Sequence, residues 1–113
     1  MPLSPTSRTL QELRERGYTP WIVESYNYFS RKRTDLFGFI DVLAIKGNKT
    51  LAVQTTSRSN VQARVKKIKA NDNYELVKTA GWLLECHGWG KMVIGKYKNG
   101  NNKLGWVNKI IKL

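Results

Sequence analysis

The sequence predicts a single α/β domain spanning residues 1–113, with helices flanking a central β-hairpin and a second hairpin at the C-terminal end. Two apolar, β-branched runs, residues 36–45 and 50–56, are separated by a turn containing Gly47 and Asn48, which is the pattern of a β-hairpin. Segments on either side of these runs carry apolar residues at helical spacing. A chain of 113 residues, 41% of them hydrophobic, is long enough to bury one core.

The first helix is expected over residues 4–16. Ser4 can cap its N-terminus because a proline follows at the first helical position, and Gly17 ends it. Thr9, with Glu12 three residues later, offers a second, later start of the capping-box type. The sequence leaves both starts open.

The other elements are predicted from the same signals of periodicity, caps and turns. In chain order they are a strand over 20–28, a basic loop over 29–35, the central hairpin, a helix carrying Val61, Val65 and Ile68, a short helix from Asp72 to Gly81, a strand over 82–87, a glycine-rich turn over 87–91, and a terminal hairpin over 91–98 and 103–113.

Three polar residues interrupt the central hairpin. Asp41 falls in the middle of an apolar strand, where a carboxylate has no structural reason to be. Side chains alternate along a strand, so Gln54 and Thr56 share one face of the second strand, while Asp41 shares a face with Leu43. If these faces coincide, three polar groups converge on one point of the sheet. Alternatively, Gln54 is a hydrogen-bonded strand residue and Thr56 reflects ordinary β-propensity.

The lone cysteine and histidine are interpreted mainly as structural. Cys86 has no partner for a disulfide and is expected to be a buried, inert thiol. His87 is either a hydrogen-bonded core or surface group or, less favoured, a general base. One Cys and one His cannot supply the usual zinc ligands, so a metal would be bound by oxygen, which indicates Mg²⁺ or Mn²⁺.

The segment from Gly38 to Ile45, followed by Leu51 to Thr56, resembles the Holliday-junction-resolvase-like branch of the PD-(D/E)XK nuclease superfamily. That core places an Asp in one strand and an acid-x-Lys pair in the next. The resemblance covers the first helix, strand, hairpin and following helix. It implies a restriction-endonuclease-like fold, with a mixed central β-sheet in αβββαβ order and helices on both faces. Gln-Thr-Thr stands at 54–56 where the family usually has Glu-x-Lys.

The resemblance implies a metal-dependent DNA endonuclease that hydrolyses phosphodiester bonds, with branched or structured DNA as a candidate substrate and a homodimer as the active form. Asp41 would be the central Mg²⁺ or Mn²⁺ ligand, Gln54 a neutral oxygen ligand, and Thr55 a ligand through its carbonyl. Thr56 occupies the position of the family's lysine. Glu15 is the candidate for the glutamate that a first helix often contributes.

Two further acids have open interpretations. Glu24 is either an edge carboxylate paired with a Lys or Arg, or an additional acid in the catalytic and metal site. Asp35 can cap a turn, pair with Arg33, or serve as the first acid of the motif. Asp41 is favoured over Asp35 for that last role. The motif name implies adjacent positions, whereas Asp35 lies six positions before Asp41.

The charge balance predicts a polyanionic partner. The chain has 20 Lys and Arg against 8 Asp and Glu, a net charge of +12, which favours DNA over a solvated basic surface and over a membrane. The helix after residue 60 shows cations on its polar face without compensating acids. The predicted phosphate contacts, several of which are candidates to replace the motif lysine, are Arg31, Lys32, Arg33, Arg58, Asn60, Arg64 and Lys67.

Two other functions compete with the endonuclease. One is a nuclease-fold DNA-binding module that lost catalysis together with the Glu-x-Lys pair. The other is a basic accessory protein of nucleic acid without any site. A cytoplasmic setting is expected because no secretory signal is visible, and a viral protein acting in the host cytoplasm fits the same expectation.

Overall fold

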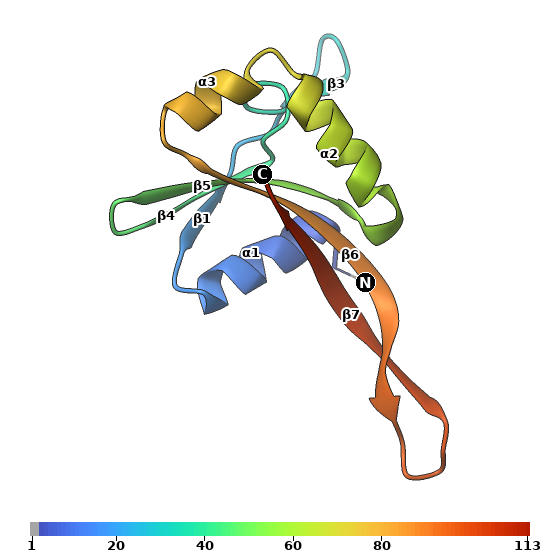
Figure 1. Ribbon diagram of the computed structural model, residues 1–113. Coiled ribbons are helices and arrows are strands. Elements are labelled where there is room, and N and C mark those ends of the chain that lie inside the picture. Colours follow the sequence, from blue (N-terminus) through green and yellow to red (C-terminus); the bar gives the residue numbers. More distant parts are fainter. Residues whose placement is uncertain (1–2) are drawn as a thin grey trace.

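The computed structural model describes residues 3–113, and it shows an α/β fold built on a mixed five-stranded sheet in the order β1-β4-β5-β6-β7 (Figure 1). Strands β5 and β6 are parallel and the other neighbours are antiparallel. The elements are α1 (Pro5–Glu15), β1 (Thr19–Ile22), β2 (Ser25–Asn27), β3 (Lys32–Thr34), β4 (Val42–Lys46), β5 (Lys49–Ser57), a 3₁₀ turn η1 (Arg58–Asn60), α2 (Val61–Ala70), α3 (Tyr74–Thr79), β6 (Leu83–Lys96) and β7 (Asn102–Lys112).

The first helix is confirmed, and so is the central hairpin from Val42 onward. Ser4 caps α1 by accepting a hydrogen bond from the Ser7 backbone N–H at 3.1 Å, so the alternative start at Thr9 is not used. The β4–β5 turn contains Gly47 at a φ of 59°, a left-handed conformation that glycine adopts without strain. Helix α1 covers one face of the sheet, whereas α2 and α3 cover the other (Figure 1).

The predicted strand over 36–45 is wrong in its first half. The chain turns at 36–40, where the Leu36 N–H donates to the Ile40 carbonyl at 3.0 Å and Gly38 takes a φ of 89°. Strand β4 therefore begins at Val42, and Asp41 stands just before it rather than in its middle. A tight turn therefore lies between Asp35 and Asp41, where the apolar pattern predicted a strand.

Two other strand boundaries also differ. The predicted strand over 20–28 divides into β1 and β2, which belong to different sheets, and the predicted loop over 29–35 contains β3. The predicted turn over 87–91 is part of the long strand β6. Gly88 serves close packing instead, because a Cβ there would lie 2.9 Å from the Val61 Cβ and 3.2 Å from the Arg58 Cα.

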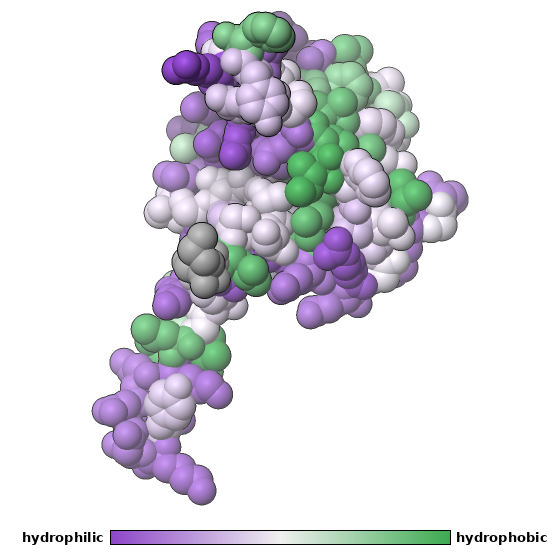
Figure 2. Space-filling view, turned by 180° about the vertical axis from the view of Figure 1, so that it is seen from behind, coloured by the Kyte–Doolittle hydropathy of each residue, from purple (hydrophilic) through white to green (hydrophobic). Residues whose placement is uncertain are grey.

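Strands β6 and β7 continue past the sheet as a two-stranded arm (Figure 1). The arm accounts for much of the elongation of the molecule, whose principal extents are 52 × 36 × 24 Å. Figure 2 shows a mostly hydrophilic arm tip, with a hydrophobic band between the tip and the body. Within residues 3–113 no helix is long and apolar enough to cross a membrane.

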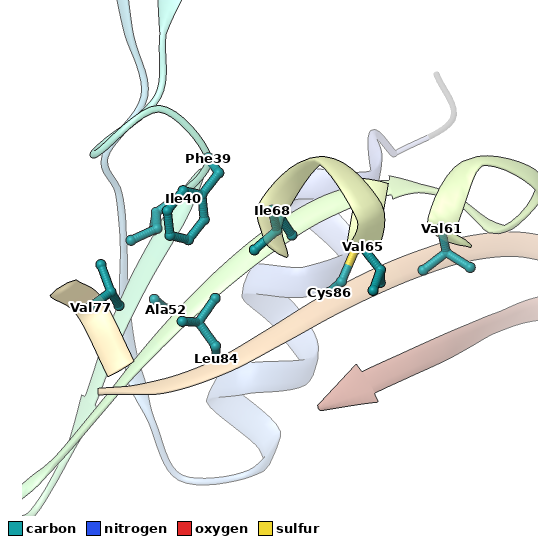
Figure 3. Packing of buried hydrophobic residues seen from close by; sticks show 9 residues of the cluster. All are labelled: Phe39, Ile40, Ala52, Val61, Val65, Ile68, Val77, Leu84 and Cys86. Carbon is teal, nitrogen blue, oxygen red and sulfur yellow. The ribbon is translucent and has the colours of Figure 1, made fainter. Parts of the chain in front are cut away.

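Apolar side chains fill both faces of the sheet. One cluster lies under α1, with Leu13 against Val42 and Val53. Figure 3 shows the larger cluster, in which α2 directs its apolar side chains onto β5 and β6. Cys86 lies in this cluster, where burial raises the pKa of its thiol to about 11, as expected for an inert cysteine. The larger cluster consists of Phe39, Ile40, Ala52, Val61, Val65, Ile68, Val77, Leu84 and Cys86.

Candidate functional site

An open cavity of about 560 Å³ lies where three parts of the fold meet. The N-terminal turn of α1 forms one wall, the segments around β2 and β3 form a second, and α2 contributes Arg64. The floor comes from the central hairpin, through Asp41, Gln54 and Thr55. The cavity therefore collects residues from segments that are far apart in the sequence.

Three carboxylates meet in this cavity. Glu24, Asp35 and Asp41 each offer an oxygen, and these oxygens all lie within 4.8 Å of one another. Glu24 lies between β1 and β2, whereas the other two acids flank the turn at 36–40. This turn folds the chain back on itself, so six residues of separation do not keep Asp35 away from Asp41. Asp35, which the sequence left ambiguous, belongs to the cluster.

Asp41 is the most constrained member of the cluster. Its side chain is almost completely buried, and its Oδ2 accepts a 2.9 Å hydrogen bond from the Thr55 backbone N–H. Burial raises its pKa to about 7; the Thr55 hydrogen bond opposes this shift, and the nearby Asp35 and Glu24 carboxylates add to it. Among the described residues, no Lys or Arg side chain pairs with Asp41. Near neutral pH this site therefore favours a proton or another cation.

Gln54 lies beside Asp41, as the alternation of the hairpin predicted. The Asp41 N–H donates to the Val53 carbonyl at 3.0 Å. Val42 is paired with Val53 in the β4–β5 register, so the preceding Asp41 lies opposite the following Gln54. Both residues line the same cavity. Thr55 faces the N-terminal turn of α1, where its hydroxyl lies 3.0 Å from the Thr6 hydroxyl.

Thr56 does not join Asp41 and Gln54. It is buried, pairs with Gly88 of β6 in the sheet register, and is not part of the cavity wall. The predicted convergence of three polar groups is thus confirmed for Asp41 and Gln54 and is wrong for Thr56. The position at which the resemblance expects a lysine is thus buried and outside the cavity wall.

Glu24 pairs with an arginine, which confirms the first of its predicted interpretations; its role as a metal-site acid stays a prediction. Its Oε1 lies 3.7 Å from Nη1 of Arg33, and it also belongs to the carboxylate cluster. Arg33 is itself part of the cavity wall and keeps most of its side chain exposed. The pair therefore places an exposed cation beside the acids, and Arg33 does not pair with Asp41.

Glu15 lies away from the carboxylate cluster, which corrects its predicted position. It is near the C-terminal end of α1, and the cavity is lined by the N-terminal end. An eleven-residue helix is roughly 16 Å long, so the two ends serve different surfaces. Glu15 instead borders a smaller cavity of about 190 Å³ together with Arg8, Glu12 and Trp106.

The predicted basic contacts fall into two groups. Arg33 and Arg64 line the carboxylate cavity. Arg58 borders a separate, shallow cavity of about 610 Å³ with Trp89 and Lys109, on the side where the arm begins. The remaining predicted contacts are exposed and line neither cavity; they are Arg31, Lys32, Asn60 and Lys67.

Comparison of the chain with models of known protein families, with curated proteins and with solved structures finds no match. The geometry of the cavity and the chemistry of its side chains are therefore the basis for a functional proposal.

Proposed function

We propose that this protein is a metal-dependent DNA endonuclease that hydrolyses phosphodiester bonds, with a restriction-endonuclease-like core related to the PD-(D/E)XK nucleases. Branched or structured DNA is the proposed substrate, and a homodimer would provide two sites for paired cuts. The observation that carries the proposal is the cluster of Glu24, Asp35 and Asp41 in an open cavity of a strongly basic protein. Gln54 stands beside this cluster at the spacing that the resemblance predicts.

The donor set fits a hard divalent cation. Mg²⁺ and Mn²⁺ prefer carboxylate and carbonyl oxygens, and the cluster offers three carboxylates with the amide oxygen of Gln54 nearby. Gln54 stands where the resemblance expects a glutamate, and Asp35 and Glu24 would supply the negative charge that this glutamine lacks. The backbone N–H and C=O of one residue in an antiparallel strand point toward the same neighbouring strand. Because the Thr55 N–H reaches Asp41, the Thr55 carbonyl is directed to the same side.

The chemistry requires a polarised phosphate, an activated water and positive charge near the scissile bond. A bound Mg²⁺ or Mn²⁺ would polarise the phosphate and lower the pKa of a water molecule. Arg33 and Arg64 are placed to hold phosphate oxygens and to replace the family's lysine. The N-terminal turn of α1, with the Thr6 and Ser7 hydroxyls, adds the positive end of a helix dipole to the same cavity.

One observation favours the alternative function, a nuclease-fold DNA-binding module without catalysis. Among the described residues the cavity wall contains no lysine, and Thr56 at the motif position is buried in the sheet. A lysine can position and activate a water, whereas an arginine stays protonated and only donates hydrogen bonds. The two functions differ in cleavage and agree in DNA binding.

The test is cleavage of supercoiled, linear and four-way-junction DNA with Mn²⁺, Mg²⁺ or a chelator. We expect metal-dependent cutting by the wild type, no cutting by Asp41→Ala, and normal cutting by the matched control Glu15→Ala. Glu15 is an acid of α1 outside the cavity, so this control removes one negative charge and leaves the site intact. If neither wild type nor control cuts any substrate while all three proteins bind DNA in a salt-sensitive manner, the endonuclease is rejected in favour of the module.

A further inference from the structure

We propose that the β2–β3 hairpin binds unpaired DNA bases by stacking, which would direct the protein to DNA containing splayed or single-stranded nucleotides. The inference rests on the proposed function because it places this hairpin on the DNA that the cavity would cut. Two strands of three residues each form the hairpin, outside the main sheet. It rises above the body at the end opposite to the arm (Figure 1).

The hairpin exposes aromatic side chains that the fold does not use. Phe29 at the turn is fully exposed, and Tyr28 is 83% exposed. Neither residue belongs to a buried cluster. Figure 2 shows hydrophobic surface directly beside strongly hydrophilic surface at this end of the molecule. Isolated apolar residues are common on protein surfaces, but adjacent exposed aromatics on a protruding turn are typical of binding elements.

The turn holds its aromatic residues in a defined conformation. The Asn27 Oδ1 accepts hydrogen bonds from the backbone N–H groups of Phe29 at 2.9 Å and Ser30 at 3.2 Å. The Tyr28 ring packs edge-on against Tyr26, with the ring centroids 5.1 Å apart. The Phe29 ring is thereby presented to solvent by an ordered backbone, so stacking on a base would cost little backbone entropy.

Charge on the same hairpin identifies the partner as a nucleic acid. Arg31, Lys32 and Arg33 begin two positions after Phe29, and the exposed tip carries no acidic residue between Tyr26 and Thr34. Aromatic rings interleaved with cations are the pattern of single-stranded nucleic-acid binding, in which rings stack on bases and cations hold the backbone.

The hairpin is continuous with the carboxylate cavity. Strand β3 ends at Thr34, and the next residue is Asp35 of the cluster. The three steps from Lys32 to Asp35 span roughly 10 Å at about 3.3 Å per strand residue. This length corresponds to about three nucleotides along one duplex strand. A base stacked at the tip would therefore lie a few nucleotides from a phosphate that a metal ion at Asp35 and Asp41 would bind.

The experiment compares binding to a full duplex and to the same duplex with a short unpaired gap that carries 2-aminopurine. A chelator is present, so cleavage does not contribute. We expect the wild type to prefer the gapped DNA and to quench 2-aminopurine fluorescence. Phe29→Ala should bind the gapped DNA roughly tenfold more weakly, abolish the quenching and change duplex binding less than about twofold. Phe29→Trp should restore both signals.

A matched control is Tyr97→Ala, which removes an exposed aromatic beside lysines near the tip of the β6–β7 arm and should leave the preference for gapped DNA intact. Equal weakening of gapped and duplex binding by Phe29→Ala, or no effect on either DNA, would overturn the inference. A difference in sedimentation between Phe29→Ala and wild type without DNA would also overturn it, because Phe29 would then belong to a protein–protein interface. Phe29-dependent binding without any cleavage would reject the endonuclease alone, and cleavage with Phe29-independent binding would reject the stacking role alone.

Discussion

Two carboxylates of this fold are buried to the same degree and have opposite electrostatic environments. Asp41 is 6% exposed and Glu85 is 5% exposed. The pKa of Asp41 is raised to about 7, whereas the pKa of Glu85 is lowered to about 2. Burial raises the pKa of both groups, so the difference comes from the partners that each site supplies.

Glu85 lies in a fully paired network beneath α1. Arg16 donates to both of its oxygens, at 2.8 and 2.9 Å, and His87 Nε2 lies 2.8 Å from Oε1. The Thr9 hydroxyl accepts from Trp89 Nε1 at 2.9 Å, which leaves its own proton for His87 Nδ1 at 3.1 Å. Burial opposes ionisation of Glu85, but the hydrogen bonds from Arg16 and His87 and the Arg16 charge outweigh it. His87 is thus a buried, hydrogen-bonded core group, as the favoured interpretation predicted.

Asp41 has the contrary arrangement. Within residues 3–113 two other carboxylates lie beside it, no Lys or Arg side chain pairs with it, and Thr55 donates to it. A paired buried carboxylate stabilises a fold, whereas clustered carboxylates without a cation destabilise it. In the proposed function a bound divalent cation would compensate the second arrangement. The comparison therefore contrasts an acid that the fold itself pairs with one that it leaves unpaired.

The largest expected effect is on the structural side. Glu85→Ala should lower the free energy of unfolding by about 3–5 kcal/mol, because Arg16 and His87 would lose their buried partner. Urea unfolding at pH 7 measures this change, with Glu15→Ala as the control that should alter stability by less than about 0.5 kcal/mol. A loss below about 1 kcal/mol for Glu85→Ala would mean that the network contributes little.

Acid titration sharpens the same point. The folded pKa of Glu85, about 2, lies below its ordinary value of 4.5, so its contribution is fully present above pH 4.5 and is lost as the pH falls through about 2. Wild type should therefore lose more stability than Glu85→Ala between pH 4.5 and 2. Parallel pH profiles for the two proteins would contradict this.

Removing the functional acid should have the opposite sign. Asp41→Asn, which still accepts from Thr55, should stabilise the metal-free protein by about 1–3 kcal/mol at pH 8. The folded pKa of Asp41, about 7, lies above its ordinary value of 3.8, so the wild type loses stability as the pH rises from about 4 to about 7. The gain should disappear below about pH 4. A destabilised Asp41→Asn at pH 8 would place Asp41 among the structural acids.

Metal should reverse this order. At ten times its Kd, Mn²⁺ should stabilise the wild type by about 1.4 kcal/mol, and the effect should grow as the pH rises toward 7 because metal and proton compete for Asp41. Asp41→Asn should show little stabilisation, and Glu15→Ala should match the wild type. Thermal unfolding with Mn²⁺ or a chelator measures each difference. Equal shifts in wild type and Asp41→Asn would locate the metal elsewhere.

The two regions also differ in how much the sequence could predict. Strand alternation and hairpin spacing were sufficient to bring Asp41 and Gln54 together, because both depend on local rules. Asp35 required a turn in which Gly38 and Phe37 adopt positive φ values, and the apolar pattern hid that turn inside an expected strand. Two acids flanking a glycine were the available signal.

Other outcomes depended on tertiary placement. Which end of α1 faces the cavity decides the position of Glu15, and helical periodicity carries no information about it. Strand alternation places Glu85 and His87 on one face of β6, but their network also includes Arg16 at the end of α1, which no local spacing indicates. The position of Glu15 and the contact of Arg16 with Glu85 depend on contacts between distant segments, which the sequence pattern does not predict.

The smallest expected effect tests the variant position of the motif. Gln54→Glu adds a fourth carboxylate beside Asp41, which should cost the metal-free protein about 1 kcal/mol at pH 8 by like-charge repulsion. The same change should tighten Mn²⁺ binding roughly tenfold, because the added charge becomes a ligand. Titration calorimetry measures the affinity, and Gln11→Glu on α1 provides a control with the same change of charge outside the carboxylate cavity. If Gln54→Glu binds Mn²⁺ no more tightly than wild type, Gln54 is a hydrogen-bonded strand residue, and Asp35 and Glu24 already complete the acidic site.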